Sequence, residues 1–123
     1  MANYLHDDIM DAGLAVITDN TENLYITSSV ATDFTEASST YKLGVKATPT
    51  FTGPANGTSG RKVTIDAITD GTVSGTGTAA FWALTDDSES KLLAAGPLAV
   101  GVAVVAGGTF TLTATAIQIP DVA

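Results

Sequence analysis

From residue 20 onward, the sequence has the composition of β-strands joined by tight turns. Threonine, valine and isoleucine recur throughout this part of the chain with glycine beside them. The segments with strand character are residues 23–29, 41–51, 61–69, 76–85, 91–95, 100–105 and 109–119. The turn signals between and within them are Gly53-Pro54, Asn56-Gly57, Asp70-Gly71, Asp86-Asp87 and Gly107-Gly108. This alternation of strand segments and turn signals predicts a mainly β chain of about seven strands, arranged as a β-sandwich of jelly-roll or immunoglobulin-like strand order.

One segment, residues 4–19, has the periodicity of a helix. Its apolar residues Leu5, Ile9, Val16 and Ile17 fall on one face of a 3.6-residue period. Aspartates occupy its first turns, where the helix dipole favours negative charge. We therefore expect a short N-terminal helix or arm over residues 1–20 and a single β-sandwich domain over residues 21–123. The apolar face of the helix either packs on the sandwich or contributes to an interface, and the sequence leaves both readings open.

Two strands carry information about burial. In residues 109–119 the apolar positions alternate from Phe110 to Ala116 and then change phase at Ile117. Because side chains of a strand alternate between its faces, this change predicts a bulge or a new pairing partner near Ala116. Residues 79–84 are apolar on both faces, which predicts a strand that is central in its sheet or covered by a neighbouring subunit. Residues 31–40 and 52–60 are small and polar, and are predicted to be extended loops available for contacts.

The composition excludes several functions. The chain has 123 residues, which is the size of one domain, and a formal net charge of -8. This acidity argues against partners that are nucleic acids or membranes, because both kinds of binding depend on Lys and Arg. The chain has no cysteine and one histidine, His6, which excludes disulfides and multi-histidine metal sites. The N-terminus does not have the pattern of a secretory signal, so we expect the protein to be made in the cytoplasm and to stay soluble.

Three segments resemble functional motifs without matching them. Residues 53–62 are rich in glycine but lack the spacing of a phosphate-binding loop. Asp86, Asp87 and Glu89 supply carboxylates that calcium prefers, but without the ligand pattern of a calcium loop, which favours a solvated turn. His6 stands beside aspartates, where an exposed side chain is favoured over a metal or acid–base site. The sequence therefore predicts no catalytic residue, no metal ligand, no cofactor and a protein that is not an enzyme.

The single tryptophan, Trp82, separates two interpretations. It lies beside Phe81 in an apolar run, which favours core packing over stacking against a sugar. A solvent-exposed Trp82 would instead favour a carbohydrate-binding module used for adsorption.

Several phrases of the sequence are similar to small proteins encoded in the structural gene clusters of tailed bacteriophages and prophages. These phrases are "NYLHDDIMDAGLAVI", "LYITSS", "TDFTEASSTYKLG", "KLLAAGPLAV" and "GGTFTLTATAIQIPDVA", and with the segment between them they cover nearly the whole chain. The resemblance implies a virion component, either a capsid decoration (cement) protein that binds and stabilises the head exterior or a tail, fibre or head–tail connector subunit. It implies no catalytic residues.

Apolar strand surface beyond the need of one core predicts self-association. The candidate interface residues are Leu5, Ile9, Val16, Ile17, Trp82, Leu84, Leu92, Leu93, Leu98 and Val100. The predicted partners are the major capsid protein and further copies of the chain, as a trimer or a dimer, within the phage particle.

Overall fold

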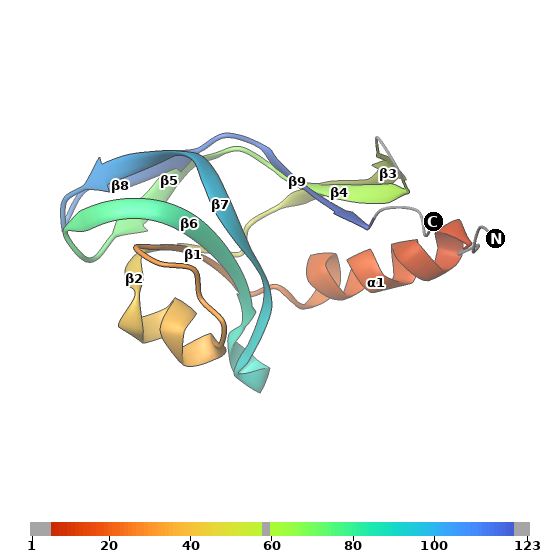
Figure 1. Cartoon of the computed structure of the whole chain (residues 1–123), viewed down its shortest axis with the longest axis horizontal. Helices are drawn as coiled ribbons and strands as arrows, with labels where there is room; N and C mark the ends of the chain where they lie inside the picture. The colour runs from red at the N-terminus through yellow and green to blue at the C-terminus, as the bar shows by residue number, and fades with distance from the viewer. Residues whose placement is uncertain (1–5, 58–59, 120–123) are drawn as a thin grey trace.

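A computed structural model describes residues 6–57 and 60–119 of the chain. It has one helix, α1 (Asp7–Asn20), ahead of the strands. The strands are β1 (Asn23–Thr27), β2 (Lys42–Ala47), β3 (Phe51–Asn56), β4 (Arg61–Ile65), β5 (Ile68–Val73), β6 (Gly77–Asp86), β7 (Lys91–Val104), β8 (Thr109–Leu112) and β9 (Thr115–Ile119). They form two antiparallel sheets, of order β7-β6-β1-β2-β5-β8 and β3-β4-β9 (Figure 1). The predicted fold class, a mainly β single-domain sandwich with one short N-terminal helix, is confirmed.

The strand boundaries differ from the sequence prediction where the chain passes between sheets. The predicted strands 41–51, 61–69 and 109–119 are each divided between the larger and the smaller sheet. The predicted strands 91–95 and 100–105 are instead joined in β7. The described residues therefore form nine strands rather than about seven.

The two sheets share a continuous two-stranded ribbon. The chain leaves β4 for β5 and returns alongside it from β8 to β9, with Ile65 opposite Thr115 and Ile68 opposite Leu112. Between Leu112 and Thr115 the returning strand exchanges β5 for β4 as its partner. The predicted change of partner near Ala116 is thus confirmed, a few residues earlier than expected. The apolar positions change phase with it, because the more buried residues are Phe110 and Leu112 in β8 and Ile117 and Ile119 in β9.

Two segments predicted as loops have a different structure, and two predicted turns, Gly53-Pro54 and Asp70-Gly71, lie inside the strands β3 and β5. Within residues 52–60, the part up to Asn56 belongs to β3 and pairs with β4, because the hairpin turn begins only after Asn56. Asp70-Gly71 lies inside β5. A Cβ atom at Gly71 would overlap the ring of Phe110 on β8, so glycine is needed there for close packing rather than for a turn.

Residues 31–40 cover the outer face of the larger sheet. They include η1 (Glu36–Thr40), a single wide helical turn closed by a 2.9 Å hydrogen bond from the backbone N–H of Tyr41 to the carbonyl of Glu36. The buried Ala31 and Ala37 pack against Tyr25 of β1 and Ala83 of β6. The predicted loop therefore completes a second, smaller core.

The main core lies on the other face of β1 and β6. Its buried residues are Leu24, Ile26, Leu43, Ile65, Ile68, Val73, Ala79, Trp82, Leu84, Val104 and Phe110. Because the two cores lie on opposite faces, β1 and β6 are covered on both sides by their own chain. The apolar character of residues 79–84 on both faces is explained by this central position.

Helix α1 packs against the smaller sheet, away from most of the larger one (Figure 1). His6 caps its N-terminus, accepting a hydrogen bond from the backbone N–H of Asp8 on Nδ1 at 3.0 Å. Met10 and Leu14 are fully buried beneath the helix. Asp11 forms an ion pair with Arg61 of β4, with Nε and Oδ1 2.8 Å apart. The helix is thus held to the sheet by an apolar row and one charged contact.

Candidate interaction surface

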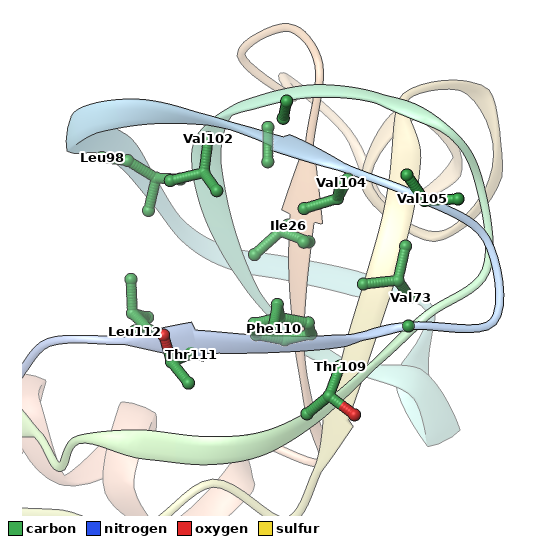
Figure 2. A pocket seen from close by; sticks show the side chains of 13 residues that line it. Ile26, Val73, Leu98, Val102, Val104, Val105, Thr109, Phe110, Thr111 and Leu112 are labelled. Atoms are coloured by element: carbon green, nitrogen blue, oxygen red, sulfur yellow. The ribbon is translucent and has the colours of Figure 1, made fainter.

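The two edges of the larger sheet face each other across an apolar groove. Within the described residues β7 pairs only with β6 and β8 only with β5, so each has a free edge. The sheet is strongly curved, and the side chains of β7 and β8 enclose a cavity of about 240 Å³ (Figure 2). Leu98 and Val102 line it from β7, and Leu112 from β8. Its floor includes the buried core residues Ile26 and Phe110. The main core therefore reaches the surface between the two edge strands.

Strand β7 bulges outward beside this groove. Pro97 lies opposite Phe81 and Val102 opposite Ala79, so residues 98–101 of β7 face the single residue Ala80 of β6. The side chain of Val100, within this bulge, is 74% exposed. A second hollow of about 270 Å³ runs along the bulge and is lined by residues of β7 together with residues 111–113. The bulge thus presents an apolar side chain next to an apolar depression.

The residues that line the groove and the adjoining hollow carry no charge. No acidic or basic side chain occurs between Lys91 and Asp121, the segment that supplies β7, β8 and β9. The exposed apolar residues here are Val100, Val102 and Val105. All the other charged residues of this acidic chain precede residue 92. The molecule therefore has an acidic part and a neutral, apolar edge.

Two of the predicted interface residues were assigned wrongly. Trp82 is 6% exposed and Leu84 is fully buried, and both belong to the main core. They are buried because β6 lies between β7 and β1 in the sheet. Both side chains point to the same face of β6, and the other residues of the main core cover that face. Neither can contribute to a subunit interface. The buried Trp82 ring is also unavailable for stacking, which argues against the carbohydrate-binding alternative.

The remaining predicted strand residues stay near the surface of β7. Leu92 and Leu93 are half-buried, and Leu92 packs against the smaller core. Leu98 is half-buried at the wall of the groove, and Val100 is exposed beside it. The structure brings Leu98 and Val100 together in the bulge and places Leu92 and Leu93 at the other end of the strand.

The predicted helix residues divide between two faces. Ile17 is half-buried against the main core, whereas Ile9 and Val16 are 60% and 48% exposed. Leu5 lies outside the described residues. The sequence assigned the packing face wrongly, because Met10 and Leu14 form the buried row and Ile9 and Val16 lie outside it. The helix therefore packs on its own sandwich, as one of the two expectations had it. A role of the exposed Ile9 and Val16 in an interface stays a prediction.

Sequence reasoning did not single out Val102, Val105 or Leu112, which shape the groove and its rim. A usable signal was present, because the unbroken absence of charge after Lys91 marks the whole region. Which of its residues are exposed depends on the pairing of β7 and β8, which no local pattern reports.

The turn between β6 and β7 contains the acidic residues considered as a calcium site. In η2 (Asp87–Glu89), the carboxylate of Asp87 accepts hydrogen bonds from the hydroxyls of Tyr25 at 2.8 Å and Thr85 at 2.5 Å. Burial, and then the bond to Asp87, raises the pKa of Tyr25 to about 12. Asp87 therefore links the turn to β1.

Glu22, which lies just before β1, interacts with the same turn through Ser88 and Asp86. The backbone N–H of Ser88 donates to Glu22 at 2.6 Å, and this bond is the main reason that the pKa of Glu22 is lowered. The hydrogen bond between the Glu22 and Asp86 side chains raises the pKa of Asp86. Within the part of the chain that the structure describes, no group of three or more Asp, Glu or His side chains is placed to hold a metal ion. The arrangement is a hydrogen-bonded turn.

Comparisons of the chain with protein-family models, curated proteins and solved structures found no match. No helix in residues 6–57 and 60–119 is long and apolar enough to span a membrane. The phage function expected from the sequence remains a prediction.

Proposed function

We propose that this chain is a non-enzymatic structural protein of a tailed-phage virion, a decoration protein that binds the exterior of the assembled head and stabilises it. Its partner in this role is the major capsid protein. The sequence phrases quoted above suggest this class of protein.

The observation that carries the proposal is the presence of two separate exposed apolar surfaces. One is the face of α1 that bears Ile9 and Val16, and the other is the β7 edge with Val100 and Val102. They belong to separate elements, because α1 lies to one side of the larger sheet that contains β7 (Figure 1). Exposed apolar patches mark interaction sites, and a chain with two of them is suited to contact neighbours on two sides. A component of a closed shell needs contact surfaces of this kind, because it has neighbours on more than one side.

The two surfaces differ in their surroundings. Ile9 follows two exposed aspartates, Asp7 and Asp8, in the first turn of α1, so a partner on this face must be neutral or basic. The β7 edge has no charge nearby along the chain. We assign the helix face to the contact with the head, because a head protein can supply a complementary surface that this acidic chain lacks.

Stabilisation would follow from mass action. A protein that binds only the assembled shell stabilises each site by about 2.7 kcal/mol when its free concentration is 100 times the dissociation constant. Contacts that bridge neighbouring capsid subunits strengthen this effect through avidity.

The test is to measure the copy number of the chain in purified particles and its binding to heads that lack it. We expect hundreds of copies per particle and co-sedimentation of the added chain with heads. The double variant Ile9→Asp, Val16→Asp should lose co-sedimentation while keeping its fold. A handful of copies would favour a connector, tail or fibre subunit, and complete absence from the particle would contradict a virion role.

A further inference from the structure

The groove between β7 and β8 interrupts an otherwise continuous wall around the main core. Ile26, Val104 and Phe110 are at most 7% exposed, yet all three line the cavity. The half-buried Leu98 and Leu112 stand on opposite sides of its opening (Figure 2). The core is therefore closed by side chains from two strands that share no backbone pairing.

The size and lining of the groove favour a protein side chain as its occupant. Its volume of about 240 Å³ is below the roughly 300–1,000 Å³ typical of sites for small molecules. None of the residues that line it is charged. A single apolar side chain presented by a folded surface would fit such a depression without leaving a buried charge unpaired.

The bulge of β7 supplies a side chain of this kind. Val100 is the most exposed of the large apolar residues in the described part of the chain, at 74%. It stands on residues 98–101, which project where the register between β6 and β7 is broken. Each copy of the chain thus carries an apolar projection and an apolar groove side by side.

Charge identifies the occupant as a second copy of this chain. Two copies with a net charge of -8 each repel one another through most of their surfaces. The repulsion is smallest where residues 92–119 meet, because this segment has no charged side chain. Interface cores are likewise depleted in charge. The neutral edge is therefore the face through which two copies can approach.

A subunit contact would need only a small part of the molecular surface. A standard interface buries about 800 Å² on each partner, which is about one-eighth of the 6522 Å² accessible surface of this chain. The neutral segment forms three of the nine described strands, including the long edge strand β7.

We propose that copies of this chain associate through the β7 edge, with Val100 of one copy seated in the β7–β8 groove of another. A reciprocal arrangement closes as a dimer, and a head-to-tail arrangement closes as a ring. The contact does not depend on head binding, which we assign to α1.

The first experiment measures the oligomeric state of the purified chain by sedimentation and native mass spectrometry. We expect assembly at about 100 µM, because interfaces of this size have micromolar or tighter dissociation constants. The Val100→Asp variant should raise the dissociation constant about a hundredfold or more, since it places an unpaired charge in the interface. Circular dichroism should show an unchanged fold, because Val100 is exposed in the single chain.

The matched control is Ile9→Asp, which changes a similarly exposed apolar residue on α1. It should leave the oligomer intact and weaken only the binding to heads. A monomeric wild type would overturn the inference and leave the proposed function unaffected. An oligomer that is broken by Ile9→Asp but not by Val100→Asp would also overturn the inference, because the contact would then lie on α1.

The second experiment uses the absence of cysteine from the chain. A Val100→Cys chain and a Thr111→Cys chain, mixed and treated with a short bifunctional maleimide, should give crosslinked pairs, because Thr111 lines the groove. Each variant treated alone should crosslink much less. Crosslinking of Val100→Cys alone as efficiently as the mixture would show that the bulges meet each other, and the seating in the groove would then be wrong.

Discussion

Strands β6 and β7 are hydrogen-bonded neighbours with similar apolar sequences, yet one is buried and the other exposed. In β6, Trp82, Ala83 and Leu84 are at most 6% exposed. In β7, Val100 and Val102 are 74% and 49% exposed. The difference comes from position in the sheet, since β6 has a strand on each side and chain packed over both faces, whereas β7 lies at the edge.

This contrast shows what an apolar strand in a sequence does and does not predict. The composition indicates that the strand will be covered, but it does not predict which segment or subunit covers it. For β6 the cover is the chain's own core and residues 31–40. For the exposed part of β7 the single chain supplies no cover, so we assign this role to a second copy. Four substitutions test the contrast.

The largest effect is expected in β6. Leu84→Ala should lower the free energy of unfolding by about 2–5 kcal/mol, because it leaves a cavity in a fully packed core. Chemical denaturation of the monomer measures this. The matched control, Val100→Ala, should change the same quantity by less than about 0.5 kcal/mol. Similar losses at both positions would mean that the bulge packs in the single chain.

The next effect lies in β7, where it touches β6. A Cβ atom at Gly96 would lie 2.7 Å from Cζ2 of Trp82. Gly96→Ala should therefore destabilise the fold by about 1–3 kcal/mol through overpacking. The control is Gly101→Ala on the same strand, where the nearest side-chain atom would be 3.5 Å away. The emission spectrum of the single tryptophan should change only in the Gly96 variant.

A smaller effect concerns the outer face of β1 and β6. Tyr25→Phe removes the hydrogen bond to Asp87 and should cost about 0.5–1.5 kcal/mol at neutral pH. Burial raises the pKa of Tyr25 to about 12 from its ordinary value of 10.0, so the native chain binds the phenolic proton more tightly than the unfolded chain does. Stability from this group is fully present below pH 10 and is lost as the pH rises toward 12.

The measurement is denaturation of wild type and Tyr25→Phe across this pH range. The difference in their unfolding free energies should shrink as the pH rises. A constant difference would show that Tyr25 titrates normally and that burial does not restrain its ionisation.

The smallest effect on the fold is expected in the bulge of β7, at Val100. Val100→Asp should alter the unfolding free energy of the monomer by no more than about 0.5 kcal/mol, while removing the oligomer. Thermal unfolding at low and high protein concentration separates the effect on the monomer fold from the effect on the oligomer. The wild type should unfold at a higher temperature when concentrated, and the variant should show no such dependence. A concentration dependence retained by Val100→Asp would locate the contact elsewhere.

Local patterns in the sequence were sufficient for the fold class. The 3.6-residue period of the N-terminal segment and the turn signals of the rest predict one helix ahead of many strands, because backbone preference acts within a few residues. The phase change before Ile117 likewise predicted a change of partner, since side-chain alternation is also local. Among the failures were the helix face and the length of β3, where packing against β4 decided the outcome.

By itself, the sequence determined that this chain is mainly β, acidic, and without charge between Lys91 and Asp121. Only the tertiary structure decided which apolar residues are covered. Trp82 and Leu84 were buried by the pairing of β6 with β1, a strand far away in the sequence, and Val100 was left exposed because β7 has a partner on one side. Burial of a strand depends on its place in the sheet, and that place is set by contacts between distant segments that no single segment encodes.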